Sequence, residues 1–319
     1  MAVKRRLKKS VKYGIIILIG LIVIAVAVLI IQDKKRKHEK WINSYEYKLT
    51  EKGYNGEEVE YLLRQDDKIK DTLLEKEYNE KIIPFLKEKY FILKNLDTYL
   101  NYYIKNNSLS LEEIVSIVNV GANNDHYDNA NKTNTNNYNQ MIVNKYNYLT
   151  EEFEAKEIVD VKNWYCYGEN KANKEAYEHF IDMFNAAKDQ NLKIIISSGY
   201  RAYQDQKETY DDYVDRYGAK KADSLAARPG YSEHETGLAL DITTGGATKD
   251  TFDSTDEFKW LQENSYKYGF ILRYPKGKEK ITGFDYEPWH YRYVGIELAE
   301  KVYKSGLTYD EYYAYYLAN

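Results

Sequence analysis

A long apolar stretch lies near the start of the chain. Residues 14–31, GIIILIGLIVIAVAVLII, are 18 positions without a charge. As a helix this stretch would be about 27 Å long, close to the thickness of the hydrocarbon core of a bilayer. Six Lys or Arg precede it, which favours a cytoplasmic N-terminus. We therefore predict a basic cytoplasmic tail over residues 1–13 and a single transmembrane anchor over residues 14–32.

A cleaved signal peptide is the alternative for this stretch. Residues 25–27 read Ala-Val-Ala, and small residues in this arrangement suit a cleavage site. Four more apolar residues follow them, which is poor context for cleavage. The uncleaved anchor is therefore the favoured interpretation.

The pattern between the anchor and the middle of the chain is helical. From residue 44 to residue 106, apolar residues recur at intervals of three and four between charged ones, as on one face of a helix. Residues 111–121 are an apolar run that fits either a buried strand or a short helix, and residues 123–139 contain eight asparagines, which indicates a loop. We predict a mostly helical stalk or spacer over residues 33–147, with a recognition domain as the alternative.

Helical and strand patterns alternate at short intervals from residue 148 to residue 319, which suggests an α+β domain. The apolar positions of residues 174–188 predict an amphipathic helix. Strands are expected in LKIIISSGYR, TGLALDI and EPWHYRYVG, and further helices in EFKWLQENSYKYG and IELAEKVYKSG.

Charge and cysteine content restrict the classes of partner. Residues 1–40 hold 11 Lys or Arg and 2 Asp or Glu, so the remainder holds 35 basic and 48 acidic residues, a net charge of −13. A body with this balance is not expected to bind nucleic acid. Cys166 is the single cysteine, so an internal disulfide is excluded.

Two of the five histidines stand beside carboxylates at the edges of predicted strands. His234 lies seven positions before Asp241, in a segment flanked by Gly230 and Gly237, and His290 lies three positions after Glu287. Two imidazoles and one carboxylate would hold a zinc ion and leave a fourth position open for water, as a catalytic zinc site requires.

Glu287 and Arg201 would supply further chemistry at such a site. Glu287 is suited to take a proton from the water, and Arg201 to stabilise an oxyanion or bind a substrate carboxylate. Each motif alone is weak. The other histidines have plainer explanations, because we expect His38 and His126 to be solvated and His179 to lie beside the apolar stripe of its helix.

Three blocks of the sequence resemble those of a known family. SSGYRAYQDQ, ARPGYSEHETGLALDI and YEPWHYRYVG are similar to the signature blocks of VanY-type D-alanyl-D-alanine carboxypeptidases, within the zinc peptidase group that includes lysostaphin-type enzymes and the hedgehog signalling domain. The resemblance covers about residues 145–300 and implies a small antiparallel sheet with flanking helices that carries one Zn²⁺, in a domain over residues 148–319.

The resemblance also implies a role for each matching residue. The family's Ser-x-His-x6-Asp and Glu-x-x-His patterns imply zinc ligands at His234, Asp241 and His290, and a general base at Glu287. Arg201 would bind the substrate and the transition state. Gln206 and Ser232 match positions that bind the terminal end of the peptide.

The function that we expect is removal of the terminal D-Ala from peptidoglycan stem peptides, outside the cytoplasmic membrane. A serine D,D-peptidase is excluded because the sequence has no Ser-x-x-Lys, the block that carries its nucleophile. Two alternatives stay open. One is an L,D-carboxypeptidase of the same family that acts on tetrapeptide stems, and the other is a non-catalytic zinc-containing receptor for wall peptides, although a receptor would be expected to lack Glu287.

Overall fold

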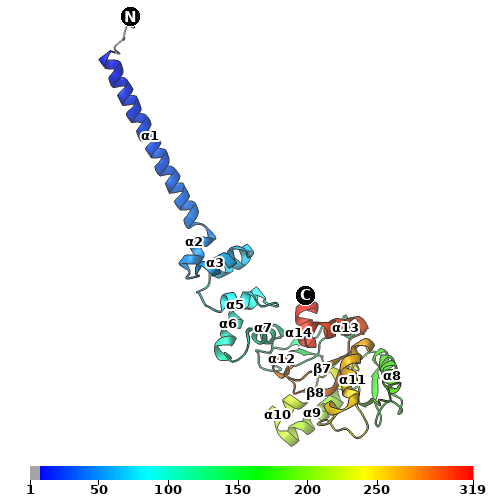
Figure 1. The fold of residues 1–319 in the computed structure, drawn as a ribbon. Helices are drawn as coiled ribbons and strands as arrows, with labels where there is room; N and C mark the ends of the chain where they lie inside the picture. The colour runs from blue at the N-terminus through cyan, green and yellow to red at the C-terminus, as the bar shows by residue number, and fades with distance from the viewer. Residues whose placement is uncertain (1–7, 319) are drawn as a thin grey trace. The chain divides into compact units, whose positions relative to one another are not determined.

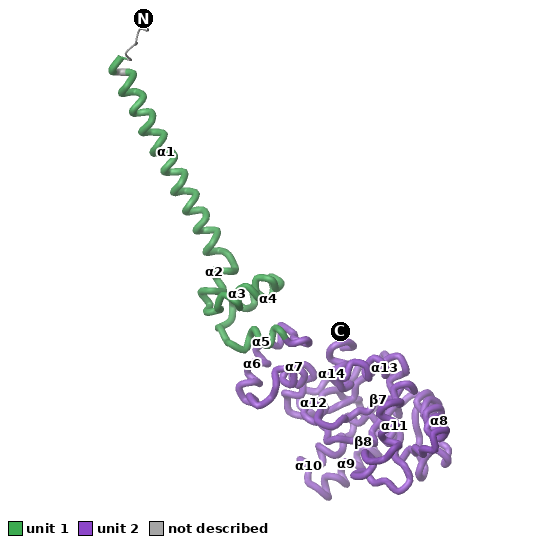
Figure 2. Tube along the Cα trace, viewed as in Figure 1, with its two compact units in different colours: residues 1–87 green, residues 88–319 purple. Residues whose placement is uncertain are grey.

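The computed structural model describes residues 8–318. The chain forms two compact units, residues 1–87 and residues 88–319 (Figure 2). The residues predicted to form the zinc site all lie in the second unit, which begins well before the start of the zinc domain proposed at residue 148.

The first unit consists of helices, as the spacing of apolar residues predicts. Its helices are α1 (Lys9–Ile42), α2 (Tyr45–Glu51), α3 (Gly56–Leu63), α4 (Asp67–Leu74) and α5 (Ile82–Leu86). Ser44 caps α2 and Asn55 caps α3 by accepting hydrogen bonds from backbone N–H groups of the first turn, which satisfies donors that a helix start leaves unpaired. Leu49, Leu62 and Leu73 are fully buried between these short helices.

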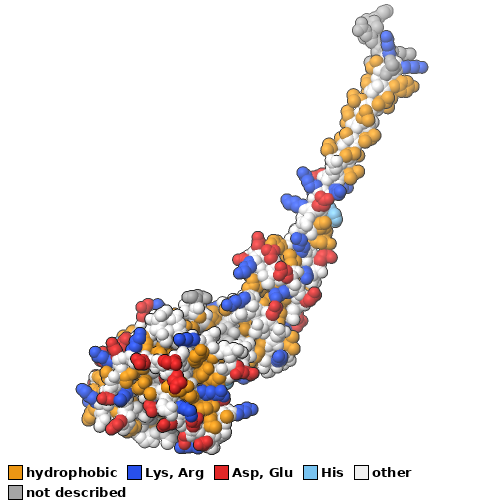
Figure 3. Space-filling view, turned by 180° about the vertical axis from the view of Figure 1, so that it is seen from behind, with side chains coloured by type: hydrophobic (Ala, Val, Ile, Leu, Met, Phe, Trp, Pro, Cys, Tyr) orange, Lys and Arg blue, Asp and Glu red, His pale blue; other side chains and the backbone are white. Residues whose placement is uncertain are grey.

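Helix α1 includes the whole of the predicted anchor. Apolar side chains cover its middle, and Lys and Arg side chains lie on both sides of this apolar part (Figure 3). Among the described residues it is the one helix long and apolar enough to cross a membrane. It continues to Ile42, beyond the predicted end of the anchor at residue 32.

The second unit combines helices with short strands. Its helices are α6 (Leu96–Lys105), α7 (Leu111–Val120), α8 (Lys174–Lys188), α9 (Tyr203–Tyr217), α10 (Ala219–Leu225), α11 (Asp256–Asn264), α12 (Glu279–Thr282), α13 (Ile296–Ser305) and α14 (Tyr309–Tyr312). Its strands are β1 (Asn131–Lys132), β2 (Asn147–Tyr148), β3 (Ile158–Asp160), β4 (Lys171–Asn173), β5 (Ile195–Ser198), β6 (Ala239–Thr243), β7 (Phe270–Tyr274) and β8 (Glu287–Tyr293). The predicted helix over residues 174–188 is confirmed with its bounds.

The main sheet has four strands in the order β5-β6-β8-β7, and every neighbouring pair is antiparallel. The predicted small antiparallel sheet is therefore confirmed. Its register sets Asp241 of β6 opposite His290 of β8, and Tyr274 of β7 opposite Glu287 of β8. Two smaller sheets pair β1 with β2 and β3 with β4.

One face of the main sheet is apolar. Leu240 and Ile242 of β6 and Tyr291 and Tyr293 of β8 are buried there in the largest core of this unit, together with side chains from α8 and α11. Figure 1 shows α8 and α11 side by side next to the strands. Because successive side chains of a strand alternate between faces, Asp241, His290 and Arg292 lie on the other face.

One sequence prediction needs correction in its bounds, one open alternative is decided, and one helix was missed. The strand expected at residues 236–242 begins only at Ala239, because Glu233–Thr236 form a 3₁₀ turn and Gly237 adopts a left-handed conformation. Residues 111–121, left open between strand and helix, form α7 and end at Gly121. Helix α9 was not predicted. Its one fully buried side chain is the polar Gln206, and the tyrosines on the same face, Tyr203, Tyr210 and Tyr213, are only partly buried.

Gly237 is required by its backbone conformation and by a close packing contact. Its φ is +71°, and a Cβ there would lie 2.5 Å from Ile158 Cδ1 and 2.9 Å from the backbone nitrogen of Asn173. We expect Gly237→Ala to lower the free energy of unfolding by at least about 2 kcal/mol, from backbone strain and overpacking. Gly245→Ala is the matched control, since the nearest atom to its Cβ would be 3.9 Å away. Denaturant unfolding followed by tryptophan fluorescence measures both, and equal stability of the two variants would contradict this explanation.

Candidate metal and catalytic site

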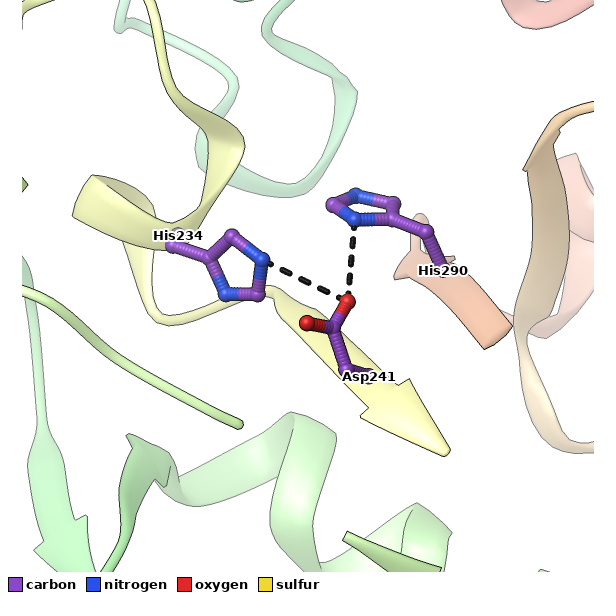
Figure 4. Close-up of side chains that lie close together, drawn as sticks. All are labelled: His234, Asp241 and His290. Atoms are coloured by element: carbon purple, nitrogen blue, oxygen red, sulfur yellow. Dashed lines mark ion pairs between the residues drawn. The ribbon is translucent and has the colours of Figure 1, made fainter. Parts of the chain in front are cut away.

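His234, Asp241 and His290 converge on one point although they come from three elements. Asp241 and His290 are opposite each other on β6 and β8, and His234 lies in the 3₁₀ turn that precedes β6. Asp241 Oδ1 is 3.2 Å from His290 Nδ1 and 3.5 Å from His234 Nε2 (Figure 4). One ligand atom from each residue lies within 4.8 Å of the others, which is close enough for one ion to contact all three.

The ring of His234 is oriented by a backbone carbonyl. Its Nδ1 is 2.7 Å from the carbonyl oxygen of Gly199. Because a carbonyl only accepts, Nδ1 carries the proton and the lone pair of Nε2 is left for the site. The backbone at Gly199 lies so close to the carbonyl of Lys171 that a Cβ would be 2.2 Å from that oxygen. A side chain at position 199 would therefore displace the carbonyl that holds His234.

The protonation of the three groups differs with their surroundings. Burial, together with the nearby Arg201 cation, lowers the pKa of His234 to about 4, so its ring is neutral. Burial opposes ionisation of Asp241, but the two histidines hold its pKa well below the usual value. Burial also opposes charge on His290, yet Asp241 and Glu233 raise its pKa to about 9. A metal ion that enters the site would therefore displace a proton from His290.

A metal ion fits these residues. Asp241 Oδ1 is buried and has no hydrogen-bond partner among the described residues, and an unpartnered buried carboxylate oxygen is costly. An ion at this point would be a partner for that oxygen and for the two imidazole nitrogens that face it. Two nitrogens and one oxygen are donors that zinc accepts, and they leave one tetrahedral position open.

Glu287 is a second carboxylate beside this cluster. Its Oε2 lies 3.6 Å from His290 Nδ1. Burial raises the pKa of Glu287 to about 7, against the opposing effect of His290. A carboxylate with a pKa near neutrality can both accept and return a proton at physiological pH, which is what a general base requires.

The site opens into a cavity of about 390 Å³. All seven residues that the sequence analysis selected line it: Arg201, Gln206, Ser232, His234, Asp241, Glu287 and His290. Two of them offer unused polar atoms, because Arg201 Nε and Gln206 Oε1 are buried without a hydrogen-bond partner among the described residues. Gln206 itself is held by the bond from its Nε2 to the carbonyl oxygen of Ala227, at 2.7 Å.

The sequence analysis missed the buried charges behind the cluster. Glu233, Arg273 and Arg292 have fully buried side chains. Glu233 Oε1 accepts from Arg273 Nε at 2.8 Å and from Arg292 Nη1 at 3.0 Å. Although burial opposes it, the two guanidiniums hold the pKa of Glu233 far below its usual range. Arginines inside the aromatic strands FILRY and HYRY were the signal, since a buried arginine needs a carboxylate.

A buried cluster of two histidines and an aspartate, beside a carboxylate of near-neutral pKa in a cleft, is the arrangement of a metal-dependent hydrolase. Residues 169–296 match the sequence model of VanY, D-alanyl-D-alanine carboxypeptidase. A D-alanyl-D-alanine carboxypeptidase of Enterococcus faecium is 32% identical over 252 residues, which are 72% of this chain and 80% of that relative. The chain therefore belongs to the VanY-type D-alanyl-D-alanine carboxypeptidase family, which confirms the resemblance.

Other relatives are more similar over a shorter part of the chain. The putative carboxypeptidase YodJ of Bacillus subtilis (strain 168) is 42% identical over 179 residues. The D-alanyl-D-alanine carboxypeptidase of Enterococcus faecalis (strain ATCC 700802 / V583) is 38% identical over 181 residues. Each match covers 54% of this chain, and 66% and 64% of these two relatives respectively. Among solved structures, the LdcB LD-carboxypeptidase is 40% identical with a TM-score of 0.55, over 59% of this chain and 91% of that chain.

Removing the charge of Asp241 tests the metal cluster directly. We expect Asp241→Asn to weaken Zn²⁺ binding by at least about 100-fold, since replacing even a residue that only supports a metal ligand costs up to about this factor. Competition with a chromophoric chelator measures the dissociation constant. His179→Ala is the control, because that histidine stacks on Tyr293 away from the cluster. Unchanged zinc affinity of Asp241→Asn would remove this residue from the site.

Proposed function

We propose that this protein is a zinc-dependent D,D-carboxypeptidase that removes the terminal D-Ala from peptidoglycan stem peptides. The observation that carries the proposal is one cavity that holds the metal cluster, the near-neutral Glu287 and the cationic Arg201 together. Membership of the VanY-type family supports the class of substrate.

Five residues of the cavity take part in the proposed reaction. His234, Asp241 and His290 would hold a zinc ion, which would supply Lewis-acid chemistry by polarising oxygen ligands and lowering the pKa of water. Glu287 accepts the proton of the attacking water and returns it to the amine of the departing D-Ala. Arg201 stabilises the negative charge that develops on the carbonyl oxygen of the scissile bond.

The peptide's terminal carboxylate is proposed to bind deeper in the same cavity. Arg201 presents a buried donor, Nε, that lacks a partner within the described part of the chain, and the hydroxyl of Ser232 is buried on the wall of the same cavity. The free atom of Gln206 is Oε1, which only accepts and would take an N–H group at the end of the peptide. Charge-assisted hydrogen bonds from a guanidinium to a carboxylate are strong and directional. This binding would restrict the enzyme to the last residue of a peptide, as a carboxypeptidase requires.

An L,D-carboxypeptidase that acts on tetrapeptide stems is the second candidate. It is favoured by the likeness to the LdcB LD-carboxypeptidase, at 40% identity and a TM-score of 0.55. The same zinc ligands and the same base would serve both reactions. The two candidates differ in which stem peptide is cut.

We also propose that α1 anchors the protein in the cytoplasmic membrane, with residues 1–13 inside the cell and the zinc domain outside. The support is a helix that is long and apolar enough to cross a bilayer and the basic residues that precede it. Stem peptides are found outside the membrane, so this orientation would bring the cavity to its substrate. The helices between the anchor and the zinc domain would act as the spacer.

Glu287→Gln is expected to lower kcat by about 100- to 10,000-fold, the contribution of a general base, and to leave zinc bound. The amide has the shape of the carboxylate but cannot accept the proton. Mass spectrometry of muropeptides after incubation with the zinc-loaded protein measures turnover, and the chelator competition measures zinc. Substantial activity of the variant would exclude Glu287 as the base.

Separate incubations with pentapeptide and tetrapeptide stems decide between the two specificities. Loss of one alanine from the pentapeptide alone supports the D,D-carboxypeptidase, and loss from the tetrapeptide alone supports the L,D-carboxypeptidase. If the protein binds zinc but cuts neither stem, the peptidase proposal fails and the receptor for wall peptides is favoured.

The anchor is tested by membrane fractionation of a chain with an epitope tag at its N-terminus. We expect the full chain to stay in the membrane pellet through an alkaline carbonate wash with its tag attached, because a helix of this apolar length partitions into the bilayer. A chain that starts at residue 41 should be released. A membrane-free full chain, or one that has lost its tag, would contradict an uncleaved anchor.

A further inference from the structure

Glu233 is a buried carboxylate that the proposed reaction does not use. It directly precedes His234 in the 3₁₀ turn. One of its oxygens, Oε1, accepts hydrogen bonds from two buried arginines, Arg273 and Arg292. Its other oxygen, Oε2, has no hydrogen-bond partner among the described residues. The nearest imidazole nitrogen to this oxygen is His290 Nε2, at 3.6 Å.

His290 presents its two nitrogens to two different carboxylates. Nδ1 faces Asp241 Oδ1, at 3.2 Å, where the ligand atoms of the cluster gather (Figure 4). Nε2 is on the opposite side of the ring, is buried, and also lacks a hydrogen-bond partner within residues 8–318. The two unpartnered atoms, His290 Nε2 and Glu233 Oε2, therefore face each other.

The chain holds Glu233 rigidly in this position. Arg292 also donates from Nη2 to the carbonyl oxygen of Met141, at 2.9 Å. Arg273 pairs with both oxygens of Asp310 in α14, and Asp310 accepts a further hydrogen bond from Asn144 at 2.7 Å. Two buried cations thus face two buried anions. Among the four carboxylate oxygens of Glu233 and Asp310, Glu233 Oε2 is the one without a hydrogen-bond partner within the described residues.

We propose that Glu233 is a positioning residue for His290: its Oε2 accepts a hydrogen bond from the Nε2–H group of the ring and so directs Nδ1 to the metal. The proposal rests on the metal site of the proposed function. His234 has a backbone carbonyl in the equivalent role, whereas His290 has a carboxylate. A carboxylate partner fixes the tautomer of a ligating imidazole and makes it a stronger donor.

The same contact joins the turn that carries His234 to the strand that carries His290. Glu233 and His234 are neighbours in one short turn, so the position of that turn sets one ligand directly and the other through Glu233. Asp310 and Arg273 then extend the connection to the C-terminal helix α14. Of this set, Glu233 is the residue that reaches a metal ligand, at 3.6 Å from His290 Nε2, and it also lines the cavity.

Zinc and cobalt binding to the full-length protein in detergent tests the proposal without reference to activity. In Glu233→Gln the side chain has one oxygen, and the two arginines need it as their hydrogen-bond acceptor. The amide NH₂ group would then face His290 Nε2–H, and two donors cannot form a hydrogen bond with each other. We expect zinc affinity to fall about 10- to 100-fold, the usual cost of losing such a partner. The visible absorption of bound Co²⁺ should also change, because the direction of one ligand changes.

Asp310→Asn is the matched control. It breaks the same buried network on the far side of Arg273, where no contact with His290 exists among the described residues, so it reports the effect of lost stability alone. We expect its zinc affinity to stay within about threefold of the parent protein. Equal losses of affinity in Glu233→Gln and Asp310→Asn would overturn the proposal, as would unchanged affinity and an unchanged cobalt spectrum in Glu233→Gln.

Glu233→Asp covers the case in which the Gln variant does not fold. It keeps the charge between the arginines but withdraws the carboxylate from His290 by one methylene. We expect its zinc affinity to fall by more than about threefold, the limit set for the Asp310→Asn control. An affinity equal to that of the parent protein would overturn the proposal.

If Asp241→Asn binds zinc as the parent does, the metal site of the proposed function fails. If Asp241→Asn loses zinc and the Glu233 variants do not, only the present inference fails.

Discussion

The register between β6 and β8 is the constraint on which the site depends. It places Asp241 opposite His290, and a slip of one residue would turn one of them to the other face of the sheet. The apolar face secures this register, because Leu240 lies opposite Tyr291 and both are buried in the core against α8 and α11. The packing that stabilises the domain and the geometry that gathers the ligands are therefore the same arrangement of two strands.

The face that carries the site is organised by charge instead. Two fully buried arginines lie behind the cluster, and Glu233 and Asp310 balance them. Burying charges is unfavourable unless each is paired and hydrogen-bonded, and removing one partner of such a pair is strongly destabilising. Such a network has little freedom to rearrange, so it gives the polar face of the sheet a fixed geometry without hydrophobic packing.

Much of this arrangement was predictable from the sequence because it follows local rules. Apolar spacing predicted α8 with its bounds, and the three short motifs selected seven residues that line one cavity. The missed features depend on tertiary contacts. Helix α9 buries one polar side chain, Gln206, and the tyrosines on the same face are only partly buried. The role of Glu233 depends on Arg273, 40 positions along the chain, which no local pattern connects to it. The alternation of apolar residues predicted a strand from residue 236, but the left-handed backbone at Gly237 delays the start of β6 to Ala239.

Glu287 and Glu233 have the same side chain, but their surroundings shift the two carboxyl pKa values in opposite directions. Both carboxylates lie 3.6 Å from a nitrogen of His290, Glu287 on the Nδ1 side and Glu233 on the Nε2 side. Glu287 is buried beside the carboxylate of Asp241, and its pKa rises to about 7. Two guanidiniums hold the pKa of Glu233 far below that of a free carboxyl. The first carboxylate can exchange a proton at neutral pH and the second cannot. In the proposed reaction, Glu287 is therefore able to move protons, while Glu233 stays charged and can hold one ring in place through every step.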